Sequence, residues 1–294
     1  MALVPLSDLL ARARAGGYAV GYFEAWDTYS FEAVAEAALA ERSPVVLGFG
    51  GMMMDQDWLD RYGIEPLGAY GRAVAQRLSV PTALILNEVW EYEHAARGAR
   101  SGFNTVMLNT CELPYEQNLE LTARLVDLAH PLGVEVQAEL GRLPSFGESD
   151  AGELTDPAQA EAFVAATGVD CLAVSVGNMH LRTDGTAEVD LPRLRAIRDT
   201  VPVPLVIHGG SGLSEGDVRS LIAEGVSLFH VGTVMKRRTW EATAAFAAEA
   251  ESPPDYQTLV GSRKPGDFLS PARAAVTESV RALMRLYGSS GRAD

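Results

Sequence analysis

The feature that most constrains the fold of this chain is a regular alternation of short apolar runs with amphipathic helical patterns. The runs are four to six residues long and nearly all apolar. Such runs are typical of parallel strands covered on both faces. Eight units of strand and helix over about 250 residues predict a (β/α)8 barrel, the TIM-barrel fold. The expected strands are Ala19–Phe23, Pro44–Gly48, Thr82–Leu86, Thr105–Leu108, Val134–Ala138, Cys171–Val176, Pro204–Ile207 and Ser227–Val231.

A single domain over residues 1–294 accounts for the whole pattern. One helix is expected before the first strand, over Ser7–Ala15, and a helical extension from about residue 253 contains another over Pro271–Leu286. A doubly wound sheet is the alternative, but no Gly-x-Gly-x-x-Gly turn follows the first strand. Between the strands, helical patterns cover Phe31–Glu41, Gly68–Leu78, Tyr115–Leu132, Pro157–Thr167, Leu191–Thr200 and Glu215–Glu224.

Composition narrows the classes of partner. The net charge of −15 argues against binding to nucleic acid or anionic membranes. No apolar run reaches the roughly 18 residues of a membrane span, and the N-terminus lacks a basic signal region, so a cytoplasmic protein is expected. Cys111 and Cys171 are too few for a disulfide framework or a cysteine zinc site. Because the protein is acidic, a small anionic substrate would need a locally positive binding site, such as a metal ion or glycine-rich backbone N–H groups.

Polar residues gather where the predicted strands end, which is where barrels of this type carry their active sites. Of the five histidines, His94 and His130 fall in helical patterns and are expected on the solvated surface. The other three fall on strand ends. The strand-end residues that could carry chemistry are Glu24, Asn87, Glu88, Asn109, Glu139, His180, His208 and His230.

Two of these histidines suggest a metal centre. His180 and His208 follow adjacent strands, so their side chains can converge, and two histidines with one carboxylate suffice for a divalent ion. Glu88 or Glu139 could supply the third ligand. We expect a divalent metal, with Zn²⁺ as the first candidate. The alternative is that these groups hydrogen-bond to one another without a metal.

A glycine-rich turn follows His208 and indicates an anion site. Three glycines in four residues leave bare backbone N–H groups that a ligand can approach. Phosphate often binds after strands seven and eight of such barrels, and Lys236 could add a positive charge. The alternative is turn chemistry alone. The residues predicted to bind substrate or phosphate are Gly209, Gly210, Ser211, Gly212, His230, Gly232 and Thr233.

The chain resembles the class II, metal-dependent ketose-bisphosphate aldolases over nearly its whole length. The motifs that carry the likeness are Gly17–Gly21, Val106–Asn109, Leu113–Asn118, Ala138–Gly141, Thr155–Pro157, Thr167–Val174, Ile207–Gly212, Phe268–Arg273 and Tyr287–Gly291. By this resemblance, His180 and His208 correspond to metal ligands, and Glu139 to a conditional one. Gly209, Gly210, Ser211 and Thr233 correspond to the site for the phosphate of dihydroxyacetone phosphate. The resemblance and the C-terminal helix together imply a homo-oligomer, most simply a dimer.

The chain departs from that family at its chemical centre. The family's third strand ends in His-Leu-Asp-His, whose Asp is the acid/base residue and whose last His binds metal. Here the same place reads Ile85-Leu86-Asn87-Glu88. Asn87 cannot exchange a proton as a carboxylate can, whereas Glu88 could bind metal through oxygen. Glu24, Asn109, Leu181 and His230 also replace the family's residues on or beside strands one, four, six and eight.

These features predict a metal-dependent carbon–carbon lyase of aldolase type. It would act on a phosphorylated or sugar-like keto substrate through a metal-stabilised enediolate, and ordinary fructose 1,6-bisphosphate is not the expected substrate. Proton transfer would fall to Glu88, Glu24 or Glu148, the last on a predicted mobile lid over Gly141–Glu153. Two alternatives stay open: an isomerase or epimerase that uses the same enediolate, and a non-catalytic protein that binds sugar phosphates.

Overall fold

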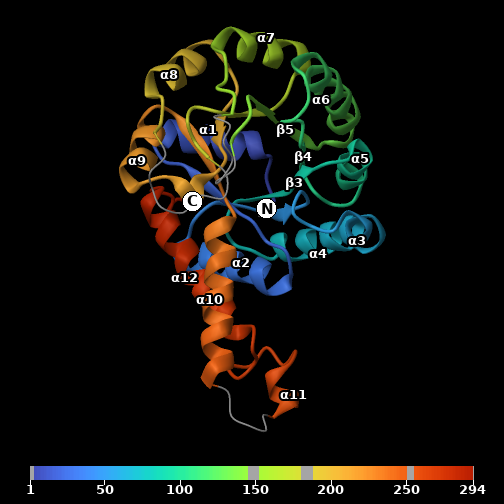
Figure 1. The fold of residues 1–294 in the computed structure, drawn as a ribbon, viewed down its shortest axis with the longest axis vertical. Helices are drawn as coiled ribbons and strands as arrows, with labels where there is room; N and C mark the ends of the chain where they lie inside the picture. Colours follow the sequence, from blue (N-terminus) through green and yellow to red (C-terminus); the bar gives the residue numbers. More distant parts are fainter. Residues whose placement is uncertain (1–2, 145–151, 180–187, 250–254, 294) are drawn as a thin grey trace.

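The computed structural model describes residues 3–144, 152–179, 188–249 and 255–293 and confirms the predicted barrel (Figure 1). The strands pair in parallel in sequence order, and β8 pairs with β1 to close the ring. Their bounds are β1 Val20–Phe23, β2 Val45–Gly50, β3 Thr82–Val89, β4 Thr105–Leu108, β5 Glu135–Leu140, β6 Cys171–Val174, β7 Leu205–Ile207 and β8 Val226–Val231.

Helices surround this ring in the order that the sequence predicts, and several begin at side-chain caps. The Asp27 carboxylate accepts from Ser30 N at 2.7 Å, and the Ser30 hydroxyl accepts from Asp27 N at 3.0 Å. This capping box starts α2 three residues before the predicted Phe31. The main helices are α1 Leu6–Gly16, α2 Thr28–Glu41, α4 Ile64–Ala75, α5 Tyr92–Arg100, α6 Tyr115–Ala129, α7 Pro157–Thr167, α8 Leu191–Thr200, α9 Glu215–Ala223, α10 Thr233–Glu249 and α12 Ser270–Leu286.

Short helical turns connect some of these elements. They are α3 Gln56–Trp58, η1 Leu59–Gly63, η2 His130–Leu132, η3 Gly210–Gly212 and α11 Tyr256–Leu259. Figure 1 shows α10 running away from the barrel, with α11 beyond its far end. None of the helices in the described part of the chain combines the length and the apolar character needed to cross a membrane.

Strand alternation divides the core into two layers. Val20 and Tyr22 point into the barrel, whereas Ala19 and Phe23 point out toward the helices. Helix α1 packs against the inner layer through Leu6, Leu9, Leu10 and Ala13. The Ser7 amide also donates to Glu135 Oε2 at 2.9 Å, which ties α1 to the start of β5. Helix α1 therefore covers the end of the barrel where the strands begin, and the predicted site residues lie at the opposite end, where the strands finish.

Two sequence expectations outside the site need correction. His94 was expected in solvent, but its side chain is buried and its Nε2 lies 3.6 Å from Asp60 Oδ1. An amphipathic helix buries one face, and His94 lies on the buried face of α5 beside Ala95. The fourth helix begins at Ile64 rather than Gly68, since Pro66 has no N–H to donate and fits a first helical turn. His130 is exposed, as expected.

The C-terminal helix α12 packs beside the seam at which the barrel closes. It packs along α2, and Tyr287 at its end stacks on Phe229 of β8 with the ring centroids 4.8 Å apart. The amide of Ala19 donates to the Tyr287 carbonyl at 3.0 Å, so the same residue contacts both sides of the β1–β8 seam. Beside it, Glu41 accepts from Arg281 Nε at 2.9 Å and from Arg285 Nη2 at 2.6 Å.

This ion-pair network predicts a stability loss at low pH. The pKa of Glu41 is lowered to about 2, mainly by the hydrogen bond from Arg285. Burial raises this pKa, but hydrogen bonds from Ser290 and Arg281 add to the lowering. Because the folded-state pKa lies below the ordinary value of 4.5, the stabilisation is complete above pH 4.5 and disappears toward pH 2. We expect Glu41→Gln to lower the free energy of unfolding by about 1–2 kcal/mol at pH 7 in urea titrations.

The control for this prediction is Glu278→Gln, which removes an exposed carboxylate that contacts the same two arginines. Its effect should stay below about 0.5 kcal/mol. Equal effects of the two variants, or a Glu41→Gln loss that is the same at pH 3 and pH 7, would contradict the assignment.

Candidate active site

Strand β3 ends in a bulge that turns two consecutive polar side chains into the mouth of the barrel. Leu86 pairs with Val106 and Val89 with Leu108, so two residues of β3 oppose one of β4. Glu88, within the bulge, has a left-handed φ of 50°. Leu86 and Val89 face the outer core, while Asn87 and Glu88 face the pocket. The strand therefore runs past its predicted end at Leu86.

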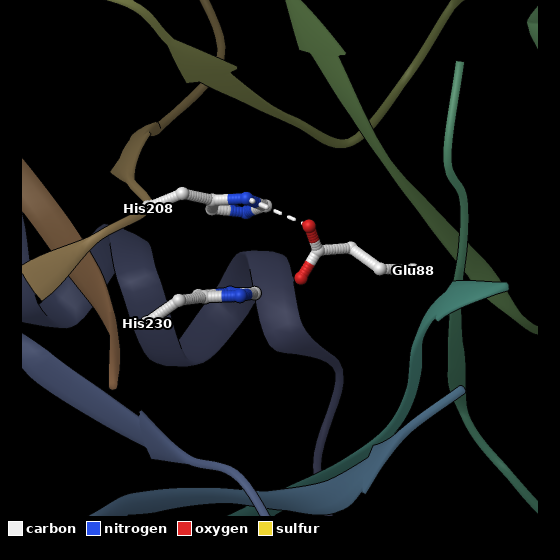
Figure 2. A group of neighbouring side chains, drawn as sticks. All are labelled: Glu88, His208 and His230. Atoms are coloured by element: carbon white, nitrogen blue, oxygen red, sulfur yellow. Dashed lines mark ion pairs between the residues drawn. The ribbon is translucent and has the colours of Figure 1, made fainter. Parts of the chain in front are cut away.

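Side chains from three strands converge beside this bulge, as Figure 2 shows for Glu88, His208 and His230. Their ligand atoms all lie within 4.8 Å of one another, and all three residues are buried. His208 Nδ1 lies 3.5 Å from Glu88 Oε1 and 3.8 Å from Glu139 Oε2. Two ligands of one tetrahedral zinc ion are about 3.3–3.5 Å apart, given zinc–ligand distances of about 2.0–2.2 Å. The donor set and its spacing thus fit a divalent metal.

The two imidazoles of this group are held by one amide. The rings of His208 and His230 stack with centroids 4.2 Å apart and an interplanar angle of 19°. The side-chain nitrogen of Gln137, on β5, lies 3.1 Å from His208 Nε2 and 3.2 Å from His230 Nε2. This amide contacts the Nε2 atoms of both rings, while His208 Nδ1 lies beside Glu88. A metal at Nδ1 would require protons on both Nε2 atoms, which the amide can accept by presenting its oxygen.

Sequence reasoning missed Gln137. The signal was available, because Gln137 lies two residues before Glu139 and strand alternation puts both on the inner face of β5. His230 was predicted from its strand end to lie with the glycine-rich turn. The structure places it in the same pocket as Gly209 and Ser211, and it also approaches Glu88 and His208.

The electrostatics of the cluster favour a cation. Burial disfavours the charged form of His208, but the carboxylates of Glu88 and Glu139 outweigh it and raise its pKa above the ordinary value. Asn87 Nδ2 donates to Glu88 Oε2 at 2.5 Å, which holds that carboxyl group in place. The same negative field that stabilises a proton on His208 would stabilise a metal ion.

The pocket above the cluster has a volume of about 130 Å³. Ser211 lines it and accepts from Val234 N at 3.3 Å, which joins the glycine-rich turn to the first turn of α10. Gly210 and Gly212 belong to the same turn but are buried, and they do not line the pocket. The pocket brings together the following predicted residues: Glu24, Asn87, Glu88, His208, Gly209, Ser211, His230, Gly232 and Thr233.

The remaining predicted residues lie elsewhere. Glu139 is buried behind the pocket, in contact with His208. His180 and the lid residue Glu148 lie outside the residues that the structure describes, as does most of the predicted lid. The lid's flanks are joined by a short antiparallel bridge between Arg142 and Glu153.

Comparison with known proteins identifies the family. Residues 4–292 match the family model for class-II fructose-bisphosphate aldolases. The chain belongs to the class-II fructose-bisphosphate aldolase family. The buried donor set is consistent with the metal dependence of class-II aldolases.

Two relatives that carry the name fructose-bisphosphate aldolase match nearly all of this chain. A probable fructose-bisphosphate aldolase of Bacillus subtilis is 32% identical over 300 residues, covering 100% of both chains. The fructose-bisphosphate aldolase of Thermus caldophilus is 34% identical over 310 residues, covering 99% of this chain and 100% of that protein. Among solved structures, the YdjI aldolase of Escherichia coli is 27% identical with a TM-score of 0.82, covering 99% of this chain and 100% of its own. Membership therefore supports an aldolase-type lyase.

Proposed function

We propose that this class-II aldolase family member is a metal-dependent carbon–carbon lyase whose metal site has been rebuilt around Glu88. The observation that carries the proposal is the buried group of Glu88, His208 and His230 at the mouth of the barrel. His208 and Glu88 would hold the ion, and Glu139, His180 or His230 would complete its coordination. Nitrogen and oxygen donors of this kind suit Zn²⁺, which is the ion that we propose.

A divalent ion in this position would act as a Lewis acid toward the substrate carbonyl. Proton transfer and the orientation of the acid/base group would fall to residues of the chain. Glu88 is the described carboxylate that both lines the pocket and approaches the histidines, so it is the first candidate for moving a proton if it is not a ligand. Asn87 can hold and orient Glu88 but cannot itself exchange a proton. Glu24 and Glu148 are the other proposed proton carriers.

The altered strand end predicts weak cleavage of fructose 1,6-bisphosphate. Loss of a positioned acid/base group costs about 10²–10⁴-fold in rate. We expect kcat/KM of the zinc-loaded protein to fall short of an ordinary His-Leu-Asp-His member of the family by this factor. Equal rates for the two enzymes would refute the idea that the chemistry has changed.

A panel of ketoses and ketose phosphates then separates the candidate functions. A lyase releases two products, whereas an isomerase or epimerase keeps the carbon skeleton whole. Tight binding without turnover would mark a non-catalytic protein.

The same proposal includes a homo-oligomer, most simply a dimer, in the cytoplasm, acting on a small phosphorylated or sugar-like substrate. Sedimentation velocity of the metal-loaded protein at micromolar concentration tests the oligomer.

A further inference from the structure

The end of β1 places a carboxylate in the part of the pocket where an anionic substrate group was expected. Glu24 extends the seam of the barrel, since its amide donates to the Val231 carbonyl at 2.9 Å. Its side chain turns into the pocket that also contains Gly232 and Thr233. There Glu24 Oε1 lies 2.6 Å from Lys236 Nζ, on the first turns of α10. A negative charge at the start of a helix is favourable, so the carboxylate occupies an electrostatically suitable position.

Two glycines give this carboxylate its space. A Cβ atom at Gly232 would lie 2.2 Å from Glu24 Oε2, and a Cβ atom at Gly50 would lie 2.8 Å from Glu24 Cδ. Neither position can hold a side chain unless the carboxylate moves. Glu24 is thus packed between the ends of β2 and β8 and is only 17% exposed. In the observed conformation the carboxylate fills the space that both glycines leave.

The charge of the pocket follows from this pairing. Among the described residues that line it, Lys236 is the one with a fixed positive charge, and Glu24 neutralises it. Glu88 adds a second negative charge deeper in the pocket. A phosphate placed against Gly232 and Thr233 would meet the Glu24 carboxylate at close range, and such like-charge contacts are strongly selected against in recognition.

We propose that Glu24 is a specificity-determining residue that fills the anion site at the start of α10. It would thereby select a keto substrate whose end nearest α10 carries no phosphate. This inference rests on the proposed aldolase function and names its substrate class. Hydroxyl groups of a polyol can donate to Glu24, because a carboxylate accepts strong hydrogen bonds. The substrate end that faces α10 is therefore an uncharged hydroxylated carbon chain.

The test is a calorimetric titration of the zinc-loaded protein with inorganic phosphate. Glu24→Gln keeps the shape of the side chain and frees Lys236, so we expect phosphate to bind at least 10-fold more tightly than to the wild type. The double variant Glu24→Gln/Lys236→Met should return to within about 3-fold of the wild type. Glu241→Gln, on the exposed face of the same helix, changes the net charge equally and should have no effect.

Two results would overturn the proposal. One is wild-type binding of phosphate as tight as that of Glu24→Gln. The other is no gain in Glu24→Gln when its zinc content and melting temperature match the wild type. If Glu24→Gln does not fold, Glu24→Ala gives the same titration with a smaller side chain. The titration needs no turnover, so it stays decisive even if the ketose panel shows no carbon–carbon cleavage and the proposed function fails.

Discussion

His208→Ala is expected to strip the protein of most of its metal and to lower kcat/KM by about 10³-fold or more. The imidazole is buried, lies 3.5 Å from Glu88 Oε1, and has its inner nitrogen engaged by Gln137. Alanine removes one ligand and leaves Glu88 and Glu139 facing each other across the gap. The rate loss follows because a Lewis-acidic metal is worth several kcal/mol of barrier, and each 1.4 kcal/mol is about tenfold.

Metal content after dialysis, measured by mass spectrometry, checks this prediction independently of any substrate. The matched control is His130→Ala, which removes an exposed histidine from η2 and should leave metal and activity unchanged. A buried substitution can also destabilise the fold, so His208→Gln and a thermal melt accompany the measurement. Full metal occupancy in a folded His208→Ala protein would show that the metal site lies elsewhere.

The second large effect is expected for Glu88→Gln. The spacing between Glu88 and His208 is that of two ligands of one ion, so we expect metal affinity to fall at least tenfold together with turnover. If Glu88 is instead the proton carrier, the variant keeps its metal and loses about 10²–10⁴-fold in rate. In that case Glu139 and the histidines would hold the ion between them.

Metal titration and kinetics on the same preparation separate these two roles. Glu91→Gln is the control, because Glu91 lies a few residues further along the chain and is exposed. Unchanged metal affinity and unchanged turnover in Glu88→Gln would exclude Glu88 from both roles.

The barrel was predictable because its strands are buried on both faces and separated by capped helices. The apolar run Thr105–Leu108 coincides with β4, and the run ending at Val231 coincides with the end of β8. The predicted strand ends were too early where polar residues continue a strand, as in β3. A polar residue at the end of a barrel strand cannot be told from a loop residue by sequence alone.

The site was predictable as a set of strand ends but not as a set of contacts. The left-handed φ of Glu88 depends on the pairing of β3 with β4, which no local pattern reports. The stacking of His230 on His208 likewise depends on the stagger between β7 and β8, whose pairing register shifts at Leu205. The pairing of Glu24 with Lys236 joins residues more than 200 positions apart.

Closure of the ring between β1 and β8 sets a constraint on biosynthesis. β1 leaves the ribosome early but finds its second neighbour only when β8 has been made, roughly 200 residues and about 10–40 s later at ordinary translation rates. Tyr287, directly after α12, is made last and packs against this seam through Ala19 and Phe229. Until β8 pairs with β1, the nascent sheet has two unpaired strand edges, which can pair with other chains. A chaperone or a slow approach to the native state is the natural cost of joining the first strand to the last.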